Sequence, residues 1–207
     1  DIKTIITESL QRMKTFDVKS VEKDFNPESP LEVHHGLGDI ARKDDIGNYS
    51  FFPGFIDLLK PKQIVELGSA MGVAVICMMA SSHKAFDLYG VTLPENGLDF
   101  CYIKPDYYPN FHPLIGDYMD LSIWPKDVDL KKTDLFYVDG LHEGPHVTEQ
   151  IKLYKPFFKS GAIILFDDIF MSPDMAEMWH GLDDVLDIDY KTTLPLHFTG
   201  FGLIKLK

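Results

Sequence analysis

Short apolar runs alternate with helix-like segments from residue 61 to the end of the chain. Five of these runs predict buried strands, at residues 63–67, 86–92, 112–115, 133–138 and 162–166, and a closing antiparallel pair is expected at 189–194 and 201–206. Helices are predicted at residues 71–82, 145–158 and 174–186, with a short one near 97–104. Alternating strands and helices are typical of a mostly parallel sheet with right-handed crossovers. The sequence therefore predicts an α/β fold with seven strands and helices on both faces of the sheet.

The charge of the chain limits its partners. Asp and Glu number 32 against 20 Lys and Arg among the 207 residues, so the net charge is −12. Contacts to phosphate groups need clustered Lys and Arg, so we expect no binding to nucleic acid or to an anionic membrane surface. A small polar molecule, a cationic ligand or a metal ion suits this charge better.

Residues 1–48 differ in pattern from the rest of the chain. Apolar residues recur at helical spacing in the first part, which predicts one amphipathic helix: Ile2, Ile5, Ile6, Leu10 and Met13. Asn-Pro, Ser-Pro and Gly-Leu-Gly sequences then interrupt regular structure. A segment of this length has too little core to fold alone. We expect it to form an N-terminal cap or lid on a main domain at residues 49–207.

The compartment is predicted from the cysteines and the apolar runs. Two cysteines, Cys77 and Cys101, are too few for a disulfide framework and are expected to be reduced. The first residues lack the pattern of a signal peptide, and no stretch has the ~20 apolar residues of a membrane span. These features predict a cytoplasmic protein. They leave its oligomeric state open, with a homo-oligomer as one option.

A glycine-containing loop follows the first predicted strand. It runs Glu66-Leu67-Gly68-Ser69-Ala70-Met71-Gly72. A phosphate-binding P-loop is excluded because it needs a Lys after the second glycine, and a dinucleotide fingerprint matches only at Gly68. An acidic residue followed by Gly-x-x-x-Gly resembles motif I of the class I S-adenosylmethionine (SAM)-dependent methyltransferases. That resemblance implies that Glu66, Gly68, Ser69 and Gly72 bind SAM near its methionine end, while a tight turn without a ligand remains the alternative.

Two further segments are compared with the same family. Its members usually carry an Asp or Glu at the end of the second strand, where it binds the ribose hydroxyls, but this chain has Thr92 there. Either Thr92 makes one weaker hydrogen bond to the cofactor or Glu95 reaches back to it. Gly116-Asp117, after the third strand, resembles the segment that contacts adenine, and a simple turn explains this pair equally well.

Three acidic residues follow two neighbouring strands. Asp139 comes directly after the fourth strand, and Asp167-Asp168 comes after the fifth. Ligands bind at the carboxyl ends of the strands in such sheets, so these side chains are expected to lie together at a functional edge. Three adjacent carboxylates repel one another unless they are protonated or neutralised by a cation. Oxygen ligands suit Mg²⁺, Ca²⁺ or Mn²⁺, although each Asp taken singly also suits a cap or a turn.

His142 lies three residues after Asp139. A lone His is usually structural or solvated. Beside an ion that acidifies an acceptor hydroxyl, however, an imidazole is a suitable general base near neutral pH. His142 is therefore the candidate catalytic residue.

The stretch from Asp134 to Asp168 resembles the matching region of metal-dependent O-methyltransferases of the catechol and the macrocin/mycinamicin type. The resemblance extends over about residues 46–207 and implies a Rossmann-like class I methyltransferase fold. It makes Asp139, Asp167 and Asp168 ligands of a divalent metal, with Mg²⁺ expected, and places Asp139 close to the cofactor as well. The macrolide group has a His at the position of His142, where catechol methyltransferases have a Lys.

The expected function is SAM-dependent and divalent-metal-dependent methyl transfer to a hydroxyl of a small molecule or sugar. Two other functions stay open from the residues alone. A metal-dependent hydrolase or lyase on the same fold agrees with the missing acid at Thr92. A non-catalytic ligand-binding module would retain only the fold.

Overall fold

A computed structural model describes the whole chain except residues 18, 23–47, 95–98, 101–102 and 104–107. Its centre is a seven-stranded sheet in the order β3-β2-β1-β4-β5-β7-β6. The strands are β1 (Gln63–Leu67), β2 (Asp87–Thr92), β3 (Phe111–Ile115), β4 (Leu135–Val138), β5 (Ile163–Phe166), β6 (Ile188–Leu194) and β7 (Phe201–Leu206). Neighbouring strands from β3 to β5 are parallel, and β7 is antiparallel to both β5 and β6. The predicted sheet is confirmed.

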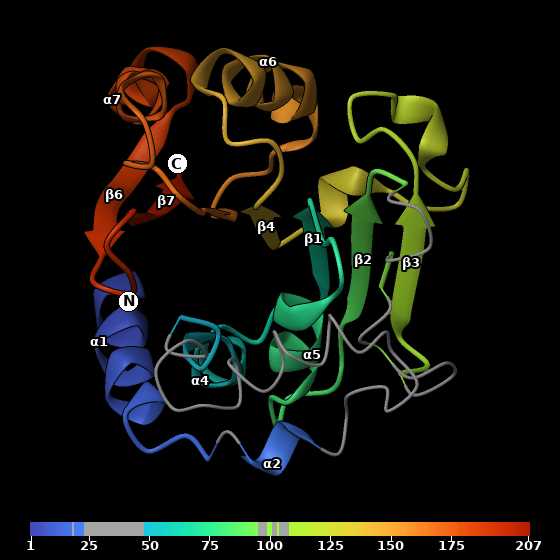
Figure 1. Cartoon of the computed structure of the whole chain (residues 1–207), viewed down its shortest axis with the longest axis vertical. Coiled ribbons are helices and arrows are strands. Elements are labelled where there is room, and N and C mark those ends of the chain that lie inside the picture. Colours follow the sequence, from blue (N-terminus) through green and yellow to red (C-terminus); the bar gives the residue numbers. More distant parts are fainter. Residues whose placement is uncertain (18, 23–47, 95–98, 101–102, 104–107) are drawn as a thin grey trace.

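Helices cover both faces of the sheet (Figure 1). One face carries α1 (Ile2–Met13), α4 (Phe51–Leu59) and α5 (Val73–Met79), and the other carries α6 (Gly144–Tyr154) and α7 (Pro173–Val185). Shorter helices are α2 (Lys19–Glu22), η1 (Leu121–Ile123), η2 (Leu130–Lys132) and η3 (Lys155–Phe157). The three-layer arrangement agrees with the α/β fold predicted from the alternation of strands and helices.

The strands supply side chains to two separate cores. Successive side chains of a strand point to opposite faces, so Ile64 packs with α4 and α5 while its neighbour Val65 packs on the other side. Both side chains are fully buried. Burial on both faces explains why the central strands are continuous apolar runs without polar alternation.

The topology brings the ends of three strands together. Strand β1 lies between β2 and β4, so the direction of winding changes there. In such sheets ligands bind beyond the carboxyl ends of the strands at this point. Because β7 runs antiparallel to β5, with Phe166 opposite Gly202, the turn that precedes β7 lies at the same edge. Residues after β1, β4 and β5 and before β7 therefore meet.

The N-terminal helix belongs to the first core. Ile2 and Ile6 of α1 are buried in the same apolar cluster as α4. The division of the chain at residue 48 stays a prediction, because residues 23–47 are outside the described part. The same is true of most of the short helix expected near 97–104, in which Asp99, Phe100 and Ile103 are described without a helix. Among the helices that the structure describes, none combines the length and apolar character needed to cross a bilayer.

Candidate active site

The loop after β1 is a tight turn against the loop after β4. Gly68 has φ +104°, and a Cβ atom there would lie 2.1 Å from the carbonyl oxygen of Asp139. The amide groups of Gly68 and Ser69 both donate to the carbonyl oxygen of Val91, at 2.8 and 2.9 Å, and Gly72 donates to Ser69. These hydrogen bonds hold the turn, and the predicted role of Gly68, Ser69 and Gly72 in binding SAM stays a prediction. Glycine is needed here for close approach of two backbone segments.

Glu66, the residue before the last of β1, is a buried acid. Its side chain accepts a hydrogen bond of 2.7 Å from the Ser69 hydroxyl. Burial raises the pKa of the Glu66 carboxyl to about 7, and the hydrogen bond from Ser69 opposes this shift. A carboxyl group that holds its proton near neutral pH without a ligand is well placed to release it beside a cationic ligand.

We expect Glu66→Gln to make the free energy of unfolding less dependent on pH. The pKa of Glu66 rises from 4.5 to about 7 on folding, so its stabilising contribution is complete below pH 4.5 and is lost as the pH rises through 7. A shift of that size corresponds to about 3 kcal/mol. Urea unfolding at pH 5 and pH 8 should show a smaller loss of unfolding free energy in the variant than in the wild type. Glu149→Gln, at an exposed glutamate of α6, is the matched control; equal pH dependence in all three proteins would contradict the assignment.

The other predicted cofactor residues lie at the ends of β2 and β3. Thr92 is 3% exposed, and its hydroxyl donates to the carbonyl oxygen of Leu93. Gly116 donates to the carbonyl oxygen of Thr92, and the Asp117 carboxylate accepts from the Met119 amide at 2.8 Å. The Asp117 side chain thus stabilises the turn after β3. The roles of these three residues in binding ribose and adenine stay predictions, as does that of Glu95, which is outside the described residues.

Asp139, Asp167 and Asp168 are brought together at the predicted edge, and we call them the acid cluster. Tyr137, on β4, is completely buried and joins two of them. Its hydroxyl lies 2.9 Å from Oδ2 of Asp139 and 3.2 Å from Oδ2 of Asp167. Tyr137 and Asp139 are two residues apart, so they point to the same side of the chain. The two-residue spacing between Tyr137 and Asp139 could therefore have identified Tyr137 as a site residue from the sequence.

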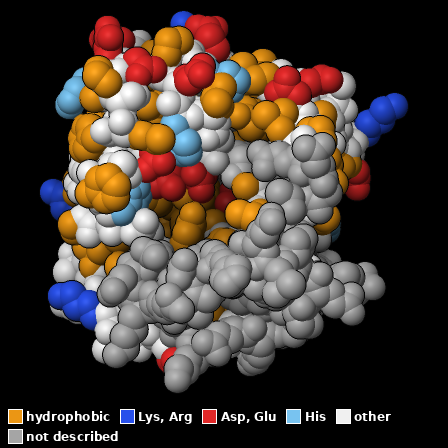
Figure 2. Space-filling view, in the orientation of Figure 1, with side chains coloured by type: hydrophobic (Ala, Val, Ile, Leu, Met, Phe, Trp, Pro, Cys, Tyr) orange, Lys and Arg blue, Asp and Glu red, His pale blue; other side chains and the backbone are white. Residues whose placement is uncertain are grey.

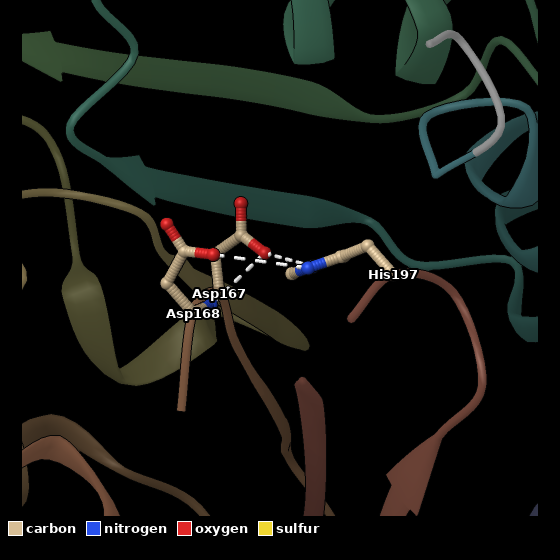
Figure 3. A group of neighbouring side chains, drawn as sticks. All are labelled: Asp167, Asp168 and His197. Carbon is tan, nitrogen blue, oxygen red and sulfur yellow. Dashed lines mark hydrogen bonds and ion pairs between the residues drawn. The ribbon is translucent and has the colours of Figure 1, made fainter. Parts of the chain in front are cut away.

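A second histidine, which the sequence did not single out, contacts the acid cluster from the turn before β7. Nε2 of His197 lies 2.6 Å from Oδ1 of Asp167, and Nδ1 lies 2.6 Å from the Thr199 hydroxyl, which donates to Asp168. Within the described ranges, one trio of possible metal ligands has donor atoms that all lie within 4.8 Å of one another, namely Asp167, Asp168 and His197 (Figure 3). The predicted antiparallel direction of β7 was the only signal in the sequence for this contact.

The pKa values of two neighbouring acids are shifted in opposite directions. Burial raises the pKa of Asp139 well above its usual range, and the nearby Asp167 and Glu66 carboxylates add to the shift. Burial also acts on Asp167, but the hydrogen bond and charge of His197 outweigh it and lower the pKa of Asp167. The hydrogen bond to Asp167 raises the pKa of His197 against the effect of burial. The pKa of Asp167 is thus lowered beside His197, while that of its neighbour Asp139 is raised.

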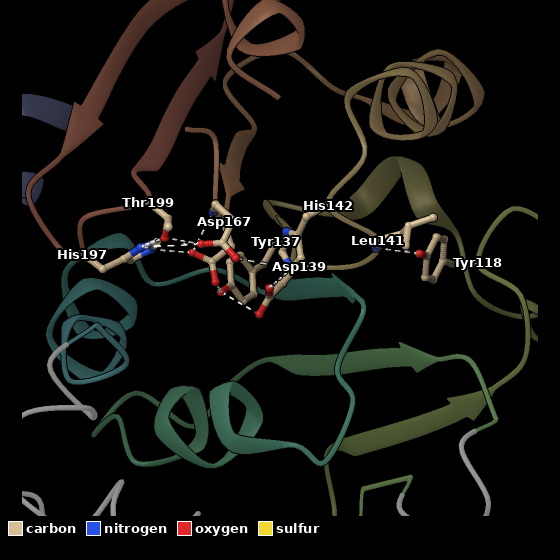
Figure 4. Close-up of polar contacts among 9 residues, drawn as sticks. Tyr118, Tyr137, Asp139, Leu141, His142, Asp167, His197 and Thr199 are labelled. Atoms are coloured by element: carbon tan, nitrogen blue, oxygen red, sulfur yellow. Dashed lines mark hydrogen bonds and ion pairs between the residues drawn. The ribbon is translucent and has the colours of Figure 1, made fainter. Parts of the chain in front are cut away.

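His142 faces the acid cluster from the side opposite His197 (Figure 4). Its Nε2 lies 3.7 Å from Oδ1 of Asp139 and 3.6 Å from Oδ2 of Asp168. The loop that carries His142 is held by Tyr118, whose hydroxyl accepts from the Leu141 amide at 3.0 Å. Figure 2 shows acidic and histidine side chains gathered at a hollow in this face of the molecule. The predicted catalytic histidine is therefore part-buried and directed at the acids.

Exposed apolar side chains surround this edge of the sheet. In the described part of the chain, the large apolar residues that are exposed follow or end strands at the carboxyl edge or lie in the turn before β7: Leu93, Ile115, Leu141, Phe170, Met171 and Phe198. Phe198, between His197 and Thr199, is 97% exposed. Each loop that contributes to the acid cluster or its histidines therefore also presents an apolar side chain to solvent.

The sheet order, with its reversed β7, and the polar site beyond the strand ends define an α/β protein of the methyltransferase type. The sequence profile of a family described as "Methyltransferase domain" matches residues 65–169, about half of the chain. The chain belongs to this family. The match extends from β1 through the loop after β5 and so includes Glu66 and the acid cluster. Family membership favours an enzyme that transfers methyl groups over a hydrolase, a lyase or a binding module. No curated protein sequence matches the chain significantly.

Solved structures share the fold over nearly the whole chain. The SAH-bound methyltransferase PaMTH1 from Podospora anserina superposes with a TM-score of 0.64 at 17% identity, over 91% of this chain and 93% of that one. The O-methyltransferase TomG from Streptomyces achromogenes, in complex with SAM, gives 0.65 at 14% identity, over 93% and 91%. An O-methyltransferase from Bacillus cereus, in complex with SAH, gives 0.64 at 11% identity, over 98% and 100%. At these identities the likeness establishes the fold.

Proposed function

We propose that the protein is a SAM-dependent O-methyltransferase that acts on a hydroxyl of a small molecule with the help of a divalent cation. The observation that carries this proposal is the position of His142, whose Nε2 lies within 3.7 Å of two carboxylates at the carboxyl edge of a methyltransferase sheet. The O-methyltransferase activity named for TomG and for the Bacillus cereus protein agrees with it.

The cofactor site is proposed at the loop between β1 and α5. SAM supplies a methyl group on a positively charged sulfur, which is a good leaving group. The buried Glu66, held by Ser69, offers a carboxyl group to the cationic methionine end. Gly68 lets this loop pack directly against the loop of Asp139. This packing would hold the cofactor and the acceptor side by side. Such positioning supplies a large part of the rate enhancement.

The acid cluster offers carboxylate oxygens to a divalent cation. Asp167 and Asp168 belong, with His197, to the trio of possible ligands whose donor atoms lie within 4.8 Å of one another, and Asp139 adjoins them through the Tyr137 hydroxyl. Carboxylate oxygens are suitable ligands for Mg²⁺ or Mn²⁺. When bound, such an ion lowers the pKa of an acceptor hydroxyl and orients it. The residues that would hold it belong to the acid cluster.

His142 is proposed as the general base. The acceptor oxygen attacks the methyl carbon, the carbon–sulfur bond breaks with its electrons going to sulfur, and Nε2 of His142 takes the hydroxyl proton. The carboxylate of Asp168, 3.6 Å from Nε2, would stabilise the imidazolium that forms. The apolar side chains around the edge, with Phe198 the most exposed, favour an acceptor that joins a hydroxyl to an apolar body.

The function is tested by binding and by transfer. Calorimetric titration with S-adenosylhomocysteine (SAH), the demethylated product, should give a Kd in the micromolar range, about 8 kcal/mol. Radiolabelled methyl transfer from SAM to a panel of phenols, apolar alcohols and glycosides should depend on added Mg²⁺ or Mn²⁺ and stop with EDTA. No heat with SAM or SAH at high concentration would refute the proposal. Transfer that EDTA leaves unchanged would refute its metal dependence.

A further inference from the structure

The six oxygens of the acid cluster are not equivalent. Both oxygens of Asp167 are engaged within the chain: Oδ1 contacts Nε2 of His197 and accepts from the Asp168 amide, and Oδ2 lies next to the Tyr137 hydroxyl. Asp167 is also the least exposed of the three acids in the cluster, with 13% of its side chain accessible. Asp167 and His197 belong to the trio of possible metal ligands, but Oδ1 of Asp167 and Nε2 of His197 are already in contact with each other at 2.6 Å. Asp167 therefore has few lone pairs left for a ligand.

Asp168 and Asp139 are held differently. Oδ1 of Asp168 accepts from Thr199, and Oδ2 of Asp139 lies next to the Tyr137 hydroxyl. Their other oxygens, Oδ2 of Asp168 and Oδ1 of Asp139, are the two that face His142. Each of these acids is thus anchored through one oxygen and directs the other toward the candidate base.

The turn before β7 supplies the anchor for Asp168. The Asp168 backbone has φ +54°, a conformation that a non-glycine residue adopts only when its surroundings hold it there. Two backbone hydrogen bonds join the two segments, from Phe170 to Thr199 at 2.7 Å and from Ile169 to Gly200 at 3.1 Å. The side chain of His197 is 11% exposed and contacts both Asp167 and Asp168.

We propose that Thr199 and His197 are positioning residues, which reserve Asp167 for the chain's own hydrogen bonds and turn Oδ2 of Asp168 toward His142. The face of the acid cluster open to the cation and the acceptor hydroxyl is then formed by Oδ1 of Asp139 and Oδ2 of Asp168. This inference rests on the proposed function. The sequence predicted that all three acids would bind the metal alike. The inference instead makes the turn before β7, which holds Asp167 and Asp168, part of the active site (Figure 4).

Variants at Thr199 test the proposal, with Mn²⁺ as the probe. Free Mn²⁺ is measured by electron paramagnetic resonance during titration of the metal-free protein. Thr199→Val removes the hydroxyl that holds Asp168 and should weaken Mn²⁺ binding about 10-fold or more, the usual effect of losing a residue that orients a ligand. Thr199→Ser restores the hydroxyl and should bind within about 3-fold of the wild type. Thr193→Val, an exposed residue of β6, is the matched control and should not change the affinity.

Stability separates positioning from a general loss of structure. A single hydroxyl contact should change Tm by only about 2–4 °C in a chain of this size. If Thr199→Val does not fold, His197→Gln should show the same loss of Mn²⁺ affinity. Equal Mn²⁺ affinity in Thr199→Val and the wild type would overturn the inference. A wild type that binds SAH but no Mn²⁺ would also overturn it and leave methyl transfer standing, whereas a wild type that binds neither would refute the proposed function itself.

Discussion

Replacing Gly68 with alanine should strongly weaken cofactor binding. A Cβ atom at this position would lie 2.1 Å from the carbonyl oxygen of Asp139 and 2.4 Å from Cα of Gly140, so two backbone segments must separate. Left-handed strain and overpacking together should cost about 2–5 kcal/mol of unfolding free energy. Because the loop of the cofactor site and the loop of Asp139 and His142 are displaced together, SAH affinity should fall more than about 100-fold, or ~2.7 kcal/mol.

Gly161 offers a control that separates the two causes. It also has a positive φ, +76°, but a Cβ atom there would meet nothing within 4 Å. Gly161→Ala should therefore show only the left-handed strain, about 1–2 kcal/mol, and should bind SAH like the wild type. Calorimetry for SAH and urea unfolding should be measured on both variants. Full SAH affinity in Gly68→Ala would show that close packing of the two loops is not required for the cofactor site.

Loss of the His142 side chain should slow methyl transfer by 10²- to 10⁴-fold, the usual contribution of a general base. Its Nε2 faces both Asp139 and Asp168, while its side chain remains 27% exposed, so removal should cost little stability. His142→Ala should therefore keep the SAH affinity and the Mn²⁺ affinity of the wild type within about 3-fold, and the loss should fall on kcat.

His112→Ala is the control for this substitution. His112 lies on β3, where it pairs with Asp87 at an exposed position. Its replacement should leave turnover unchanged. Two results would contradict the assignment of His142 as the base. Unchanged kcat in His142→Ala would remove it from the reaction, and a loss of Mn²⁺ binding as large as the loss of kcat would make it a metal ligand.

The strands were accessible to sequence reasoning because their signals are local. Burial on both faces requires continuous apolar runs, and the acids that end β4 and β5 mark where those strands stop. The helix α4 was missed for a different reason. Its sequence, Phe-Phe-Pro-Gly-Phe-Ile-Asp-Leu-Leu, contains a proline and a glycine, which usually interrupt a helix.

The candidate site was accessible only in part. Parallel neighbouring strands imply that Asp139 and Asp167-Asp168 share an edge, and His142 follows within one turn of chain. Gly68 was predicted to bind the cofactor, with a tight turn as the alternative, but its contact with the Asp139 backbone depends on how two loops pack. In the same way, the hydroxyl of Thr92 is turned toward Leu93, which no property of the residue itself indicates.

By itself the sequence determined the class of fold, the edge at which the site lies and the acids gathered there, because strand periods, strand ends and glycine turns depend on neighbouring residues. Only the tertiary structure decided which partners those acids have. His197 and Thr199 reach Asp167 and Asp168 across about thirty residues of chain, through the antiparallel pairing of β7 with β5. Tyr137 joins Asp139 to Asp167 because two strands lie side by side. Hydrogen bonds of this kind depend on distances of a few tenths of an ångström, which arise when the layers pack.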